Sequence, residues 1–147
     1  MKSLAMSVTS PDLEHGARLG DRHSADGGNV APRLTIAGIP DEALELAVIV
    51  HDPDAPMPHG FTHWVRYGIP AVDGDIALGV GRDGPNSTGR PGWYGPQPPV
   101  GHGDHHYYFW VYALRAAVEG EPTRERFLER SAPDIVAQAR LVGVFSR

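Results

Sequence analysis

Three stretches of the chain have the hydrophobic pattern of buried β-strands. Residues 44–50, LELAVIV, are apolar at almost every position and lie between turn residues, which predicts a central strand covered on both faces. Residues 63–69, HWVRYGI, and residues 105–114, HHYYFWVYAL, are rich in the aromatic and β-branched side chains that strands favour. We expect these segments to be neighbouring strands of one sheet.

Side-chain alternation predicts which residues of these strands share a face. In the second strand, one face should carry His63, Val65, Tyr67 and Ile69. The opposite face should carry Trp64 and Arg66. In the third strand, His105 and Tyr107 should point to the same face.

Outside these three segments, the pattern in the N-terminal two thirds of the chain predicts short strands joined by long loops. Residues 3–8, SLAMSV, alternate, and residues 33–39, RLTIAGI, predict a strand that Pro40 stops. Between them, residues 9–32 are polar and rich in glycine, which indicates mostly loop. Residues 81–103 are rich in glycine and proline, and a loop of this length inside a small domain is usually functional.

The C-terminal part changes to a helical pattern. Residues 122–130, PTRERFLER, predict a short helix. Residues 131–139, SAPDIVAQA, predict a second helix, with Ser131 as N-cap and Asp134 completing a capping box. The last apolar segment, RLVGVF at 140–145, fits a closing strand.

Composition limits the class of protein. A chain of 147 residues with 41% hydrophobic residues suits a single domain over residues 1–147. Its 18 glycines and 14 prolines favour a β-rich fold. A net charge of -5 argues against a nucleic-acid-binding surface. The absence of cysteine excludes disulfides, thiolate zinc sites and a cysteine nucleophile.

The location that we expect is the cytoplasm, without stable insertion into a membrane. The segment MKSLAMSVTSPD has no apolar stretch of the length that a secretory signal needs. No part of the chain approaches the roughly 20 apolar residues of a membrane span.

Polar side chains gather at the ends of the three strong strands, where rigid sites are commonly built. The first strand runs into DPDAP, which contains two acids, and the other two strands begin with a histidine. The group consists of Asp52, Asp54, His63, His105 and Tyr107.

This group has three interpretations. Two histidines with a carboxylate suit a metal, although no compact ligand motif such as H-E-x-x-H is present. A hydrolase would need a nucleophile, but there is no G-x-S-x-G motif and Ser87 has no adjacent base in the sequence. An anion pocket would use histidine and tyrosine donors, with a carboxylate to orient and charge a histidine.

Backbone N–H groups in the loop could add donors for an anion. The candidates that are not proline are Gly95, Gln97, Val100 and Gly101. With protonated histidines, anion binding should weaken as the pH rises through their titration.

The motifs resemble the phosphatidylethanolamine-binding protein family, in its bacterial branch. DPDAP is followed by HW and then by GPQPPVGHGDHHYYFWVYAL, which matches the pattern G-P-x-P-P-x-G-x-G-x-H-x-Y-x-F-x-x-Y-A-L. GGNVAPRLTIAGIP and ARLVGVF are similar to two further motifs, so the resemblance covers nearly the whole chain. It implies an antiparallel Greek-key β-sandwich with a large central sheet, a smaller sheet and short C-terminal helices.

The resemblance also implies a pocket for small anions at one edge of the large sheet. Its residues would be Asp52, Phe61, His63, Gly95, Gln97, Pro99, His105 and Tyr107. Asp52 would position a histidine, whereas Asp54 would fix the turn through local backbone hydrogen bonds. A cis bond is implied between Ala55 and Pro56. The sequence departs from the family pattern near this wall at Ile36, Phe61, Trp93 and Gln97.

The function we expect is non-catalytic binding of a small anion that carries a phosphate or carboxylate group, without a cofactor. One alternative is an interaction module that regulates a kinase or protease, and another is a metal-assisted hydrolase. A homodimer is a further alternative, because an aromatic strip could form a dimer face or pack within the monomer. The strip consists of His106, Tyr108, Trp110 and Tyr112.

Overall fold

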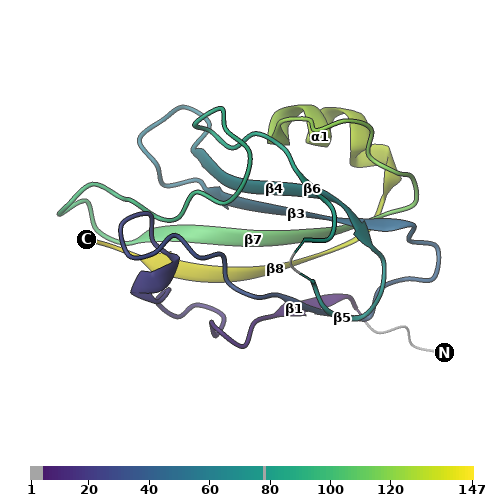
Figure 1. The fold of residues 1–147 in the computed structure, drawn as a ribbon, viewed down its shortest axis with the longest axis horizontal. Coiled ribbons are helices and arrows are strands. Elements are labelled where there is room, and N and C mark those ends of the chain that lie inside the picture. The colour runs from purple at the N-terminus through teal and green to yellow at the C-terminus, as the bar shows by residue number, and fades with distance from the viewer. Residues whose placement is uncertain (1–4, 78) are drawn as a thin grey trace.

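A five-stranded antiparallel sheet forms the centre of the molecule in this computed structural model, which describes residues 5–77 and 79–147. The strands, in spatial order, are β6 (Arg82–Asp83), β4 (Phe61–Pro70), β3 (Glu45–Asp52), β7 (His105–Leu114) and β8 (Ile135–Phe145) (Figure 1). A three-stranded sheet consists of β1 (Ser7–Thr9), β2 (Thr35–Ala37) and β5 (Gly74–Asp75). The helical elements are α1 (Arg124–Ser131) and two 3₁₀ turns, η1 (Asp21–His23) and η2 (Ala132–Asp134).

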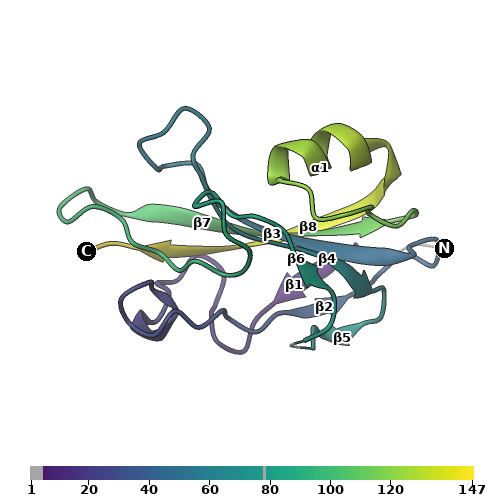
Figure 2. The same ribbon diagram turned by 45° about the horizontal axis from the view of Figure 1, so that its top comes forward.

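The two faces of the large sheet are covered by different layers, and the predicted Greek-key sandwich is confirmed. Figure 2 shows α1 on one side of the large sheet and the strands of the small sheet on the other. Strands β3, β4 and β6 are consecutive neighbours, and β7 then returns to the free side of β3, which gives the Greek-key order β7-β3-β4-β6.

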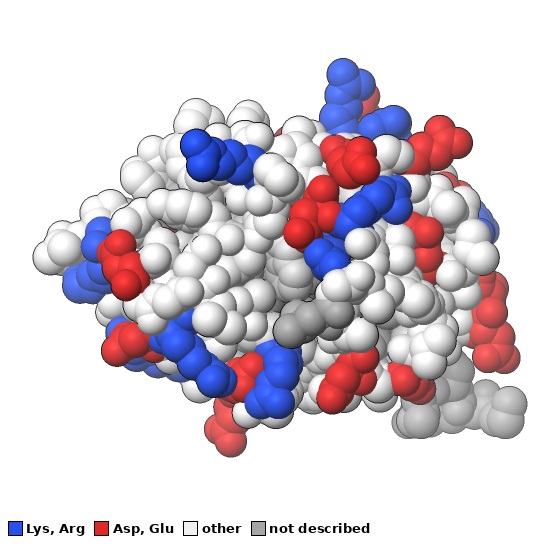
Figure 3. Space-filling view, in the orientation of Figure 1, with Lys and Arg blue, Asp and Glu red and all other residues white. Residues whose placement is uncertain are grey.

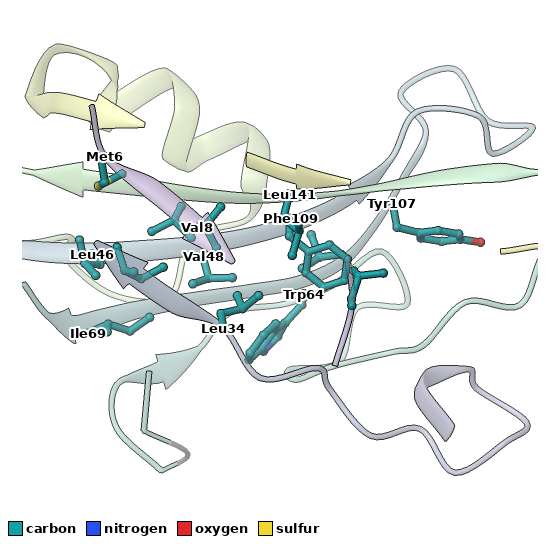
Figure 4. Close-up of a cluster of buried hydrophobic side chains, with 14 of the residues drawn as sticks. Met6, Val8, Leu34, Leu46, Val48, Trp64, Ile69, Tyr107, Phe109 and Leu141 are labelled. Carbon is teal, nitrogen blue, oxygen red and sulfur yellow. The ribbon is translucent and has the colours of Figure 1, made fainter. Parts of the chain in front are cut away.

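Each layer buries its own hydrophobic cluster. The side that packs on the small sheet, called here the sandwich face, includes Met6, Val8, Ile36, Leu46, Val48, Phe109 and Leu141. The opposite side, called the helix face, includes Ala47, Ile49, Val65, Tyr67, Leu114 and Phe127 of α1. Figure 4 shows Tyr107 at one end of the sandwich-face cluster, with its hydroxyl pointing away from the other labelled side chains.

The observed strands lie in the segments where the sequence predicts them, with small differences in length. β3 is buried from Leu46 to Asp52, as its continuous apolar pattern predicted. β1 and β2 are shorter than the predicted segments 3–8 and 33–39, and residues 3 and 4 lie outside the described residues.

The predicted alternation of β4 holds for Trp64, Val65 and Tyr67 but is wrong for His63 and Ile69, because two bulges interrupt the strand. The pairing of β3 with β4 shifts between Leu46 and Val48 and again between Val50 and His51, and β4 contributes the extra residue each time. One additional residue reverses which face the following side chains occupy. Val65 and Tyr67 therefore belong to the helix face, whereas Trp64 and Ile69 belong to the sandwich face, and His63 lies beside Tyr107.

The second predicted helix is also wrong. Residues Ala132–Asp134 form a 3₁₀ turn without a side-chain cap from Ser131, and β8 begins directly at Ile135. Asp134 contacts Arg115 instead of the helix N-terminus. Pairing with β7 along ten residue pairs offers more backbone hydrogen bonds than one short helix, so the tertiary partner overrides the local pattern.

The helix-face aromatic strip is partly packed within the monomer. Tyr112 lies against Phe127 of α1, with ring centroids 5.6 Å apart. Tyr108 and Trp110 are half-buried, and the guanidinium of Arg140 lies over both rings at 5.3 and 5.5 Å.

Charged side chains of both signs are mixed on the surface. On the face drawn in Figure 3, the Lys and Arg side chains lie among Asp and Glu side chains and form no patch of their own. None of the helices in the described ranges is long and apolar enough to cross a membrane.

Candidate ligand-binding pocket

A cavity of about 270 Å³ lies where β3 ends and where β4 and β7 begin. Seven of the nine predicted site residues line it: Asp52, Phe61, His63, Gln97, Pro99, His105 and Tyr107. The sequence reasoning missed the other lining residues, which are Ala55, Pro56, Met57, Thr88, Tyr94 and Pro98. Most of these lie in the two proline-containing loops, so the proline pattern was the available signal.

Asp52 and His105 form a buried pair at the base of the cavity. The Asp52 Oδ2 atom lies 2.6 Å from His105 Nδ1, and both side chains are almost fully buried. Asp52 Oδ1 accepts the backbone N–H of Asp54 at 2.7 Å. Burial raises the pKa of Asp52, and the hydrogen bond from His105 opposes this shift. An ionised Asp52 can only accept, so it fixes the proton on Nδ1 of His105.

His102 covers the second nitrogen of His105. Its Nδ1 atom lies 2.6 Å from His105 Nε2, and the two rings are 4.8 Å apart. His102 is exposed and lies between Gly101 and Gly103, which have φ values of 76° and 86°. These left-handed conformations suit glycine, and they mark a turn that presents the His102 ring to His105. Only the two flanking glycines hinted at this contact in the sequence.

His63 is held as a neutral ring. Its Nδ1 donates to the carbonyl oxygen of Tyr94 at 2.5 Å. Burial lowers the pKa of His63 to about 4, so the ring is uncharged at neutral pH. The expectation of a cationic histidine is therefore wrong for His63.

Tyr107 supplies a free hydroxyl to the cavity. Its side chain is 1% exposed, and its hydroxyl has no hydrogen-bond partner among the described residues. Because no buried side-chain N or O atom in those residues lacks a partner, the hydroxyl must open into the cavity. Burial raises the pKa of Tyr107, so the hydroxyl keeps its proton and can donate.

Gly95 lies behind the cavity wall and does not line it. Its N–H donates to Asn29 Oδ1 at 2.6 Å, and a Cβ at this position would lie 2.1 Å from the His23 carbonyl oxygen. The N–H of Gly101 likewise donates to the carbonyl of Arg147. Two of the four expected backbone donors are therefore already used within the protein.

Asp54 also lies outside the cavity. Its Oδ2 accepts from the backbone N–H and from Nδ1 of His106, at 2.9 and 2.8 Å. The local hydrogen bond expected of Asp54 is made by Asp52 instead, so Asp54 ties the turn to β7.

The predicted cis bond between Ala55 and Pro56 is wrong, because this peptide bond is trans. The N–H of Met57 donates to the Ala55 carbonyl at 2.7 Å, which closes a tight turn around Pro56 with the trans form.

The four departures from the family pattern divide into two pairs. Phe61 and Gln97 line the cavity, and Gln97 accepts from the Tyr94 hydroxyl at 2.5 Å. Ile36 is buried in the sandwich-face cluster, and Trp93 packs between Trp64 and Phe109. Only the first pair is placed to contact a ligand.

The structure does not bring together the residues that a metal site or a serine hydrolase would need. Across residues 5–77 and 79–147, no three His, Asp or Glu side chains form a group that could hold a metal ion. The Ser87 hydroxyl accepts from the backbone N–H of Thr62, and Thr88 donates to Asn86.

Comparison with known proteins gives one consistent result. The family model described as phosphatidylethanolamine-binding protein matches residues 9–146. The protein LppC of Mycobacterium tuberculosis is 40% identical over 146 residues, which cover 95% of this chain and 72% of LppC. The UPF0098 protein PYRAB11530 of Pyrococcus abyssi is 38% identical over 139 residues, covering 86% of this chain and 77% of its own length.

Solved structures agree with this match. CT736 of Chlamydia trachomatis superimposes with a TM-score of 0.90 and 32% identity, covering 97% of this chain and 98% of CT736. YbcL of E. coli has a TM-score of 0.89 and 29% identity, covering 98% of this chain and 99% of YbcL. A carboxypeptidase Y inhibitor, with 12% identity and a TM-score of 0.62, shares the fold alone.

We predict that acid destabilises the protein through its buried histidines. Burial holds the pKa values of His51 and His63 at about 4. The unfolded chain takes up these protons first, so stability is complete above about pH 6.5 and is lost as the pH falls towards 4. Each histidine should remove about 2 kcal/mol from the unfolding free energy between pH 7 and pH 5. The raised pKa of Asp52 acts in the opposite direction, so a variant is needed.

Urea denaturation at pH 7 and pH 5 measures this loss. His51→Gln should reduce the loss, because glutamine does not titrate. Equal losses in the His51→Gln variant and the parent protein would contradict the assignment.

Gly95→Ala should destabilise the fold by about 3 kcal/mol, because its Cβ would collide with the backbone of His23, Ser24 and Ala25. Gly20→Ala is the matched control, because its nearest new contact is an ordinary 3.7 Å. Thermal melts of both variants check this. Unchanged stability of Gly95→Ala would show that the close packing around Gly95 is wrong.

Proposed function

The chain belongs to the phosphatidylethanolamine-binding protein family, and on that premise we propose that it is a non-catalytic binding protein for a small anionic group of phosphate or carboxylate type. The observation that carries the proposal is the Tyr107 hydroxyl, a donor on a buried ring that opens into the cavity and has no hydrogen-bond partner among the described residues. A charged oxygen of a ligand could accept from this hydroxyl, and hydrogen bonds to charged groups are stronger than those between neutral groups.

The pocket would hold an anion by hydrogen bonds and not by a surplus of positive charge. No Lys or Arg is among the residues that line it. Hydrogen bonds are stronger at such a site than at the surface, because the apolar walls keep the local dielectric constant low. The walls are formed by Met57, Phe61, Pro98 and Pro99.

His105 would become a second ligand contact when His102 moves away. Asp52 fixes the ring through Nδ1, so Nε2 is the nitrogen that faces a ligand. In the structure that nitrogen is occupied by His102, whose exposed position between two glycines allows it to swing outward.

The arrangement of hydroxyl groups supports binding without catalysis. Thr88 lines the cavity, but its hydroxyl donates to Asn86 and has no histidine or carboxylate partner in the part of the chain that the structure describes. A serine or threonine nucleophile needs an adjacent base.

A protein-interaction role has separate support on the helix face. Tyr108, Trp110 and Arg140 are of the residue types enriched at protein interfaces, and these three side chains keep part of their surface open to solvent. A kinase, a protease or a second copy of the chain are the partners that we consider for this surface. The cytoplasmic location stays a prediction.

Tyr107→Phe should weaken the binding of inorganic phosphate by about 10- to 100-fold, the range for one hydrogen bond to a charged group. Isothermal titration calorimetry at pH 7 measures the change. Tyr108→Phe is the control, because Tyr108 lies on the opposite face of β7. The proposal fails if the parent protein binds neither phosphate nor acetate, or if both variants bind like the parent.

His102→Ala should tighten phosphate binding by about two- to tenfold, because the ligand no longer has to break the contact between His102 and His105. The same calorimetry measures the effect, with the exposed His15→Ala as control. Weaker binding in His102→Ala would mean that His102 contacts the ligand itself and does not compete with it.

A further inference from the structure

His63 presents an acceptor to the cavity instead of a donor. The Tyr94 carbonyl has no proton to give, so the contact of 2.5 Å places the proton on Nδ1 of His63. In a neutral ring, Nε2 then carries the lone pair. The His63 side chain lines the cavity, and no described residue bonds its Nε2. Because no buried side-chain nitrogen in those residues lacks a partner, Nε2 must be open to the cavity.

The surroundings of His63 favour this neutral state. The titratable groups near it are His51 and Asp52 on β3, His105 and Tyr107 on β7, and Tyr94 in the adjoining loop. Burial is the main cause of the low pKa of His63, and the hydrogen bond to the Tyr94 carbonyl opposes it. The neighbouring His51 and His105 lower the pKa further. The only carboxylate in this set, Asp52, is already bonded to His105.

The cavity therefore offers one acceptor and one donor side by side. The rings of His63 and Tyr107 are 5.1 Å apart, and the Tyr107 hydroxyl keeps its proton. A carboxylate, a sulfate ester or a doubly ionised phosphate presents only acceptors, so its oxygen would meet the lone pair of Nε2. A singly protonated phosphate presents both an O–H donor and charged acceptor oxygens.

We infer that the pocket recognises a phosphomonoester in its singly protonated form, with the P–O–H donating to His63 Nε2 and an anionic oxygen accepting from Tyr107. The inference rests on the proposed function, because it specifies the anion that the same pocket takes. A phosphodiester carries no such proton, so an intact diester headgroup matches the pair less well.

The size of the cavity limits the ester group. At about 270 Å³, the cavity lies just below the usual volume of ligand pockets, roughly 300–1,000 Å³. The apolar walls around Phe61 and Met57 favour a short apolar substituent over a polar one. The same phosphomonoester chemistry occurs on a soluble ester and on a lipid with a terminal phosphate.

Phenyl phosphate and phenyl sulfate provide a matched test. Both are monoanions at pH 5.5, because the second pKa of a phosphate ester is about 6, but only the phosphate carries a proton. Calorimetry on the full chain at pH 5.5 should show phenyl phosphate binding about 10- to 100-fold more tightly. Between pH 7 and pH 8 its Kd should rise about tenfold as the proton is lost, whereas the Kd of phenyl sulfate should stay constant.

Two variants separate the acceptor from the donor. His63→Phe removes the acceptor, so the preference for phenyl phosphate over phenyl sulfate should fall to about one. Tyr107→Phe removes a donor that both ligands use, so it should weaken both by the same factor. If His63→Phe does not fold, the comparison of the two ligands on the parent protein still decides the question.

Equal affinity for the two ligands at pH 5.5, or the same pH dependence for both, would overturn the inference and leave the proposed function intact. Tight binding of the diester methyl phenyl phosphate would also overturn it. If neither ligand binds, the inference fails, and calorimetry with inorganic phosphate and acetate then decides the proposed function. Flotation with vesicles that contain phosphatidic acid, compared with soluble phenyl phosphate, distinguishes a lipid source from a soluble one, and binding of either supports the inference.

Discussion

The antiparallel pairing of β3 with β4 on one side and β7 on the other determines where everything else lies. Because both neighbours run opposite to β3, the end of β3 meets the starts of β4 and β7 at one edge of the sheet. Asp52, His63 and His105, which are far apart in the sequence, are therefore brought to the same cavity. The proline-containing loops that follow β3 and precede β7 complete its walls, since they leave from that edge.

A bulge in β4 then decides the chemistry of the cavity. Val50 pairs with Trp64 and His51 pairs with Thr62, so the extra residue of β4 is His63 itself. It lies beside Tyr107 on the same face as Trp64. Bulges commonly redirect a side chain next to a functional site. Once there, the ring is kept neutral by burial, which lowers its pKa, while the Tyr94 carbonyl opposes this shift and places the proton on Nδ1. The site offers matched hydrogen-bonding groups where the sequence had suggested positive charge.

The DPDAP segment illustrates how two acids separated by one proline acquire different tasks. Asp52 is buried, and its two oxygens connect the turn to His105. Asp54 is half-exposed and connects the same turn to the backbone of His106. Both acids therefore anchor the turn to β7, but only Asp52 also controls a ring that lines the cavity. The contact between His102 and His105 extends this chain of hydrogen bonds to the solvent.

Apolar runs and turn residues are local properties of the chain, so the sequence by itself determined the strong strands and the polar group at their ends. The Greek-key sandwich and the rest of the predicted cavity lining came from the resemblance of its ordered motifs to a known family. The sequence could not determine the bulges in β4, since these depend on register with β3, and it mistook the start of β8 for a helix, since only pairing with β7 outweighs that pattern. Gly95 and Asp54 were recognised as important, but their contacts with His23 and His106 come from distant segments. The protonation of His63 was likewise decided by the tertiary structure, because burial and the Tyr94 carbonyl exist only in the folded chain.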